Sequence, residues 1–287
     1  GLTSDFMSGS ILINLDSEDE GELFIGCAGG VDTTAHFDYT TKKIDKELLT
    51  YKIGFCGGVG GHSGDDIDKG RANAIQLLSR SLYKIMKEFN VSLCAIDGGN
   101  KRNAIAREAY AIIALKGEDL KAIKKMHMAT AEEIKAEYAA TEPNISPVFE
   151  EAQWSEGAID SQTAHNLISC FNSAPHGVLA MSMEMKGLVE TSTNLASVKM
   201  VDGRIRVGTS QRSSINSARH HAAEKVEAAF LLAGAEVTHE SEYPGWKPQL
   251  KSPVLDLTKR GYKELFGVDP IVRAIYAGLE CGLILDK

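Results

Sequence analysis

The chain has 287 residues, of which 43% are hydrophobic and 24% charged, a composition typical of a globular protein with a substantial core. Its formal net charge of -8 and its 7% aromatic content argue against a nucleic-acid partner, which would favour a basic surface with aromatic stacking residues. The five cysteines form no CxxC pair, no apolar run reaches the length of a membrane span, and the amino terminus has no secretion-signal pattern. We therefore predict a cytoplasmic protein with free thiols and with neither a nucleic-acid nor a membrane partner.

The amino-terminal region combines a short apolar run with a dense acidic cluster. Residues 11–15 are mostly apolar and partly β-branched, as in a strand buried on both faces. Four carboxylates follow within residues 16–20, and a second apolar run covers residues 23–27. Acidic side chains at the carboxyl end of a buried strand favour a ligand or metal site, although a solvated turn between two strands has the same composition. A calcium loop of the EF-hand type is excluded because its twelfth position would be Cys27, where a bidentate Glu is required.

The next part of the chain predicts elements in the order strand, strand, helix, strand, strand, helix. Apolar alternation and helical spacing place these elements at residues 31–39, 48–56, 69–89, 91–96, 108–115 and 120–140. This order predicts an α+β arrangement in which one sheet is covered by helices on a face. Five glycines between residues 57 and 64 surround His62, so we expect a tight turn there that approaches another surface closely.

The second half repeats this pattern before the composition changes. We predict a helix at 157–171, a strand at 188–201, a hairpin turn at Asp202-Gly203, a strand at 204–209, a helix at 213–233 and a strand at 236–242. A rigid loop rich in Pro and Gly then covers residues 243–248. It leads to a helix at 253–266 with Ser252 as its cap, a strand at 271–276 and a non-helical end.

Six motifs, in order, resemble the aminoacyl-histidine dipeptidase family of the co-catalytic zinc exopeptidase and deacylase superfamily. They are ILINLDSEDEGELFIGCAGG from Ile11, GGHSG from Gly60, RNAIARE from Arg102, GLVETSTN from Gly187, YPGWKP from Tyr243 and AGLECG from Ala277. Together they span nearly the whole chain, and six ordered matches are far more specific than any one alone.

The resemblance implies a fold and a domain organisation. It predicts an α/β catalytic domain of the zinc-exopeptidase type, present in part at residues 1–29 and 243–287, and interrupted at residues 30–242 by an α+β lid. In this superfamily the lid also mediates dimers, so a homodimer is expected. The resemblance further implies that members continue beyond both ends of this sequence.

The resemblance also implies a chemistry and a set of site residues. It predicts hydrolysis of Xaa-His and similar dipeptides by a metal-activated water at two zinc ions, for which Asp16 is the one ligand that matches a position in this chain. His62 matches the lid histidine that helps to hold the substrate carbonyl, typically from the partner subunit. Substrate-binding roles are implied for Asn103, Asn194, Arg212 and Glu280, with Arg212 as a carboxylate clamp and Glu280 near the free amino group.

Simpler interpretations stay open for these residues, and other acidic or histidine pairs are set aside. In these interpretations His62 belongs to a flexible surface loop, and Asn103 and Asn194 are turn residues. Arg212 would then lie at the exposed start of a helix, and Glu280 would be an acidic loop residue. Pairs that resemble ligand motifs but fit solvated faces better are His36 with Asp38, Glu132-Glu133, Glu150-Glu151 and His220-His221 with Glu224. Because one ligand cannot hold two zinc ions, we expect this polypeptide alone to be inactive. The alternatives are a non-catalytic lid and dimerisation module, or a related tripeptidase, carboxypeptidase or amide deacylase.

Overall fold

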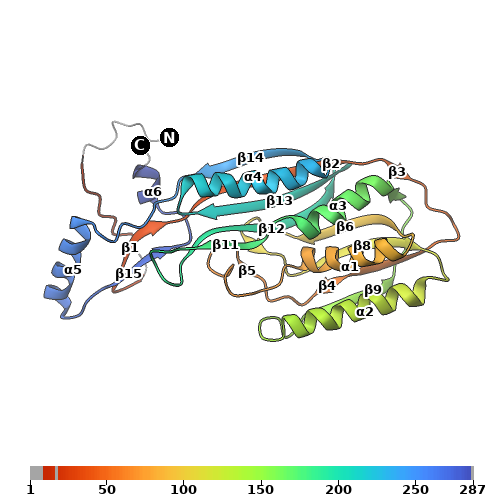
Figure 1. Ribbon diagram of the computed structural model, residues 1–287, viewed down its shortest axis with the longest axis horizontal. Helices are drawn as coiled ribbons and strands as arrows, with labels where there is room; N and C mark the ends of the chain where they lie inside the picture. Colours follow the sequence, from red (N-terminus) through yellow and green to blue (C-terminus); the bar gives the residue numbers. More distant parts are fainter. Residues whose placement is uncertain (1–8, 17–18, 286–287) are drawn as a thin grey trace.

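The computed structural model describes residues 9–16 and 19–285, and its centre is a nine-stranded antiparallel sheet (Figure 1). The strand order is β14-β2-β13-β12-β6-β8-β4-β9, and β11 pairs additionally with β12. These strands are β2 (Gly29–Asp38), β4 (Leu49–Cys56), β6 (Ser92–Gly99), β8 (Ala109–Leu115), β9 (Ser146–Glu151), β11 (Gly177–Met181), β12 (Val189–Val201), β13 (Arg204–Ser213) and β14 (Glu236–Tyr243). Two short ladders flank the sheet, β5 (Gly61–His62) with β7 (Ala104–Ile105) and β3 (Thr41–Lys42) with β10 (Ala158–Ile159).

Four helices supply apolar side chains to one core against this sheet. They are α1 (Ala74–Glu88), α2 (Leu120–Glu137), α3 (Ser161–Ser173) and α4 (Asn216–Leu232). Fully buried residues of α1 and α3, such as Leu78 and Leu167, share this core with sheet residues such as Phe37 and Ile53. Helix α1 begins at the Asn73 cap, whose Oδ1 accepts hydrogen bonds from the backbone nitrogens of Ile75 and Gln76. The predicted mixed class, with one sheet covered by helices, is confirmed.

The two halves of the sheet meet at a short joint. Strand β12 pairs with β6 only through Ser197 opposite Gly99 and Val198 opposite Gly98. Beside this joint, Asn73 donates a hydrogen bond of 2.6 Å from Nδ2 to the carbonyl oxygen of Leu195. The cap of α1 therefore also fastens β12 to the half of the sheet that contains β6, β8, β4 and β9.

Residues 22–27 and 253–285 form a separate group of elements at one end of the molecule (Figure 1). Strand β1 (Glu22–Cys27) pairs in parallel with β15 (Ile271–Ile275), and α5 (Pro253–Phe266) and α6 (Glu280–Leu285) lie at the same end of the molecule. The loop before α5 is anchored to β1, because Cys27 and Trp246 exchange backbone hydrogen bonds of 2.9 Å in both directions.

Several predicted elements differ from the observed ones. The buried strand expected at residues 11–15 is wrong: Ile11, Ile13 and Leu15 are exposed and irregular, because no strand among the described residues pairs with them. Strand β13 continues to Ser213, where a helix was expected to begin, and AGLECG leads into α6 instead of remaining non-helical. Ser252 precedes α5 but its side chain makes no capping hydrogen bond. The Asp202-Gly203 turn is confirmed, since both residues have positive φ, 53° and 74°, as a type I′ hairpin requires.

All five cysteines are free, and four of them are buried. Within the part of the chain that the structure describes, no helix has the length and apolarity needed to cross a membrane.

One buried histidine in this core predicts a pH dependence of stability. His127 is 0% exposed, its Nδ1 lies 2.8 Å from Ser81 Oγ, and its ring packs against Phe55. Burial lowers its pKa from 6.5 to about 4. Between these values the unfolded chain binds a proton at this residue and the native chain does not, so stability falls as the pH falls from 6.5 towards 4, by up to roughly 3 kcal/mol.

Urea unfolding between pH 7.5 and pH 5 measures this dependence. In the H127Q variant, the free energy of unfolding should depend less on pH, because the contribution of His127 is removed. Its free energy of unfolding at pH 7.5 should also be lower than that of wild type. The exposed residue His165 provides the matched control, since H165Q should leave the slope unchanged. An unaltered slope in H127Q would show that this histidine does not carry the effect.

Candidate functional site

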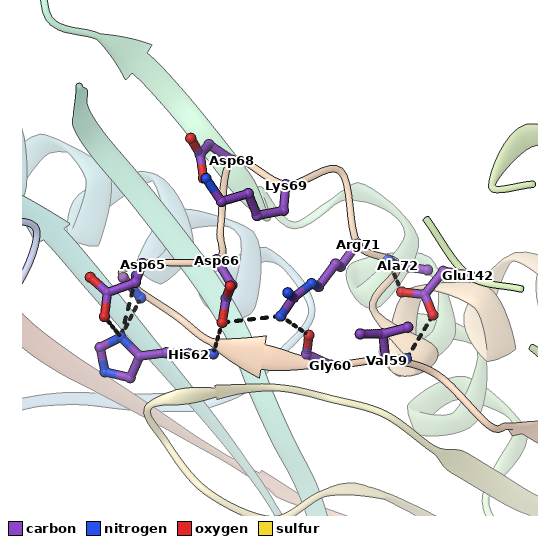
Figure 2. A network of polar contacts seen from close by, with 11 residues as sticks. Val59, Gly60, His62, Asp65, Asp66, Asp68, Lys69, Arg71, Ala72 and Glu142 are labelled. Carbon is purple, nitrogen blue, oxygen red and sulfur yellow. Dashed lines mark hydrogen bonds and ion pairs between the residues drawn. The ribbon is translucent and has the colours of Figure 1, made fainter. Parts of the chain in front are cut away.

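The loop that carries His62 is fastened at both ends by a buried carboxylate. Glu142 is 2% exposed and accepts hydrogen bonds from the backbone nitrogens of Val59, at 2.7 Å, and Ala72, at 2.8 Å. Figure 2 shows this carboxylate bridging the start of the loop and the start of the segment that leads into α1. A buried acid with two backbone donors holds the chain more rigidly than an ordinary surface turn.

Inside the loop, a charged pair determines the course of the backbone (Figure 2). Asp66 Oδ2 accepts the backbone N–H of His62 at 2.8 Å and lies 3.0 Å from Arg71 Nη1. Arg71 Nη1 also donates to the carbonyl oxygen of Gly60 at 2.5 Å. A side chain at Gly61 would collide with both Arg71 and Asp66, and its φ of +143° is unfavourable for other residues, so glycine is required there.

His62 itself is partly exposed, with 32% of its side-chain surface accessible. Its Nδ1 lies 3.3 Å from the backbone nitrogens of Gly64 and Asp65, which donate to it, and 3.2 Å from the carboxylate of Asp65. No hydrogen bond to Nε2 is present among the described residues. The imidazole is therefore oriented by its own loop, and Nε2 is available to a ligand.

Asn103 and Asn194 lie on two chain segments that contact each other. Strand β5 pairs with β7, and the Ser63 nitrogen donates to the carbonyl oxygen of Asn103 at 2.9 Å. Asn194, in β12, donates from Nδ2 to the carbonyl oxygens of Arg102 and Ala104, at 3.3 and 2.9 Å. These two residues flank Asn103 in the sequence. The buried Asn194 Oδ1 has no partner among the described residues, whereas the Asn103 side chain is exposed.

Arg212 lies in β13 and not at an exposed helix start. It is 8% exposed, and Nη1 donates to the carbonyl oxygen of Tyr276 at 3.2 Å. Its Nε is buried without a partner, and no carboxylate of the described residues forms an ion pair with it. Tyr276 is held in turn by its hydroxyl, which donates to the Arg212 carbonyl oxygen at 2.9 Å, and burial raises the pKa of this hydroxyl.

The Tyr276 carbonyl oxygen connects Arg212 with the loop of His62. A Cβ atom placed on Gly64 would lie 2.5 Å from this oxygen and 3.1 Å from the His62 ring. The structure thus brings His62, Arg212, Asn194 and the backbone at Asn103 into one region, built from residues that are far apart in the sequence.

Asp16 and Glu280 lie near the chain ends. Both are exposed, and Asn14 Nδ2 lies 3.4 Å from Glu280 Oε2, so the segment of Asp16 runs beside α6. In the described ranges no group of three or more His, Cys, Asp or Glu side chains is arranged to hold a metal ion. These residues therefore do not fit a two-zinc centre by themselves, and the ligand role of Asp16 stays a prediction.

Four residues of the site were not predicted from sequence: Asp66, Arg71, Glu142 and Tyr276. Asp66 and Arg71 lie in a charged loop sequence, and Glu142 lies beyond the end of α2, so their residue types alone indicate exposure. Only Tyr276 carried a usable signal, because it directly precedes the AGLECG motif.

Comparisons with known proteins show what this chain is similar to. Residues 45–142 match the family described as the peptidase dimerisation domain, M20_dimer. The chain is 36% identical over 283 residues to the cytosol non-specific dipeptidase of Escherichia coli (strain K12), covering 99% of this chain and 58% of the relative. It superposes on the crystal structure of aminoacylhistidine dipeptidase from Vibrio alginolyticus with a TM-score of 0.95 and 35% identity, covering 100% of this chain and 58% of that protein.

The chain thus spans a little over half the length of both relatives. The similarity covers nearly the whole chain in both comparisons. The resemblance is confirmed: nearly the whole chain is similar to two proteins named as dipeptidases, and residues 45–142 match the peptidase dimerisation domain family.

Proposed function

We propose that the protein containing this chain is a dipeptidase that cleaves Xaa-His and related dipeptides. The observation that carries this proposal is Arg212, a nearly buried guanidinium that has no carboxylate partner in the described part of the chain. A buried charge of this kind is costly unless a ligand supplies the opposite charge. The free carboxylate of a dipeptide has that charge, and its two oxygens suit a guanidinium fork.

We propose that two further side chains act on the rest of such a ligand. The unpartnered Asn194 Oδ1 suits a peptide N–H, and His62 Nε2 suits the carbonyl oxygen, where negative charge develops during hydrolysis. Asn103 contributes through its backbone position and its exposed amide. With Arg212 binding the carboxylate and His62 binding the scissile carbonyl, the site would select short peptides that have a free carboxyl end.

The catalytic centre and the domain division remain proposals from the resemblance. We infer that residues 1–29 and 243–287 belong to the catalytic domain and residues 30–242 to the lid, which the separate β1–β15 ladder supports. Asp16 is proposed as one ligand of a zinc pair, and Glu280 as the partner of the substrate's ammonium group. The contact between Asn14 and Glu280 supports placing these two segments together.

We also propose a cytoplasmic homodimer. The matched peptidase dimerisation domain supports dimer formation, and the name of the Escherichia coli relative places that protein in the cytosol. A lid that contributes His62 across a dimer would make activity depend on association.

A hydrolysis assay tests the function. The whole protein with zinc is expected to release histidine from glycyl-histidine, and to act poorly on a tripeptide, on an N-acetyl amino acid and on a peptide amide. Preference for the tripeptide or for the acetylated substrate would replace the proposal with the corresponding tripeptidase or deacylase. Absence of turnover on every substrate would reject it.

A second candidate applies to the 287-residue chain by itself, which we infer to be a non-catalytic lid and dimerisation module. The matched dimerisation domain favours it, as does the lack of a clustered ligand set among residues 9–16 and 19–285. Sedimentation should give a dimer, and the same peptide assay with zinc should give no turnover. A strictly monomeric species would contradict this candidate, and so would hydrolysis by the isolated chain.

A further inference from the structure

Among the described residues, hydrogen bonds to the His62 ring reach one nitrogen only, Nδ1. The backbone N–H groups of Gly64 and Asp65 both point at Nδ1 over 3.3 Å. A ring nitrogen that accepts from an N–H must carry its lone pair, so the proton of the neutral imidazole then resides on Nε2.

One nearby group favours the opposite tautomer. The Asp65 carboxylate lies 3.2 Å from Nδ1 and would accept a proton carried there. Its side chain is 61% exposed, so the attraction is screened by water and ordering the side chain has an entropic cost. The backbone N–H groups of Gly64 and Asp65 have no such entropic cost, because the loop already orders them. A proton on Nδ1 would also point at these two N–H hydrogens and be repelled by them.

The backbone groups stay in place because Asp66 and Arg71 hold the turn. Asp66 accepts the His62 N–H at 2.8 Å and pairs with Arg71 at 3.0 Å, and Arg71 reaches back to the carbonyl oxygen of Gly60 (Figure 2). Both side chains are partly buried, with accessible fractions of 27% and 24%. Neither has an atom within hydrogen-bond distance of the imidazole ring.

We propose that Asp66 and Arg71 are positioning residues that hold His62 as the Nε2–H tautomer, so that the ring presents a hydrogen-bond donor to its ligand and not a base. The role of this donor toward a peptide carbonyl rests on the proposed function. The tautomer itself does not, and it can be measured in a protein without activity.

Nitrogen NMR of the chain with ¹⁵N-labelled histidine tests the proposal, with H62Q assigning the His62 signals. At pH 8 the expected spectrum has an unprotonated Nδ1 and a protonated Nε2. The matched pair of variants is D66A and D65N. D66A should move His62 to a mixture of both tautomers, whereas D65N should leave the spectrum of wild type unchanged.

Each result supports or overturns the proposal. A proton on Nδ1 in the wild type overturns it, and so does a tautomer change in D65N, which would make Asp65 the controlling group. An unchanged tautomer in a folded D66A overturns the positioning role. If D66A does not fold, D66N and R71M are used, and D66N should be closer to wild type because its amide oxygen still accepts the His62 N–H.

Kinetics of the whole protein separate this proposal from the proposed function. If dipeptides are hydrolysed, D66A should reduce kcat roughly tenfold with little change in KM, since a misdirected donor weakens stabilisation of the developing charge more than substrate binding. Wild-type protein that shows the Nε2–H tautomer but no turnover would reject the dipeptidase and retain the positioning roles.

Discussion

Under the proposed dipeptidase function, replacing Arg212 by methionine in the whole protein is expected to lower kcat/KM for glycyl-histidine by roughly 10²- to 10³-fold, because truncating one partner of a desolvated charge pair costs about 2–5 kcal/mol. Methionine preserves much of the side-chain volume, so β13 should retain its packing. The loss should appear mainly in KM if the carboxylate is bound equally in the ground state and the transition state. Steady-state kinetics of wild type and R212M measure both constants.

The matched control for this prediction is a change in the substrate. Glycyl-histidine amide lacks the carboxylate, so wild type should hydrolyse it as poorly as R212M hydrolyses the acid, and R212M should discriminate little between them. The R212K variant keeps the positive charge but lacks the bidentate geometry of the guanidinium group. Its kcat/KM should therefore lie between those of R212M and wild type. Equal losses by R212M on the acid and on the amide would show that Arg212 supports the fold and does not bind the carboxylate.

Replacing Gly99 by alanine is expected to destabilise the protein by about 3 kcal/mol or more, the combined cost of left-handed backbone strain and overpacking. Gly99 has φ of +59°, and a Cβ there would overlap the carbonyl oxygen of Ala196 in β12. The substitution falls on one of the two residue pairs that join the halves of the sheet. Urea unfolding of wild type and G99A at pH 7.5 gives the difference.

Gly187 separates the two causes of this effect. Its φ is +83°, but a Cβ at this exposed position would meet nothing within 4 Å. G187A should therefore show only the backbone strain, about 1 kcal/mol. If G99A is no less stable than G187A, the close approach at the sheet joint does not limit stability.

Much of the fold follows from local patterns in the chain. The alternating and helical runs that predicted β2, β4, β6, β8, β12 and helices α1 to α5 reflect burial on one side of each element, which a single sequence records directly. The run at residues 11–15 did not form a strand because a strand depends on partners, and an apolar run does not reveal whether they are present.

The candidate site was predicted in its residue types but not in its construction. The glycine-rich motif around His62 and the motif containing Asn194 were recognisable, whereas Glu142 was not predicted and Arg212 could equally have been the exposed start of a helix. Both are buried because elements distant in sequence cover them, Glu142 by the loop at Val59 and Ala72, and Arg212 by Tyr276.

The sequence by itself determined the mixed fold, most of its longer helices and strands, the resemblance to dipeptidases and the motif containing His62, because each depends on residue types at short spacing. Only the tertiary structure decided that Arg212 has no acidic partner within the described residues, that its guanidinium meets the loop of His62 at Tyr276, and that Asp66 and Arg71 hold that loop. These properties depend on which segments, distant in sequence, bury a charged side chain. The residues next to that side chain in the sequence do not reveal which segments these are.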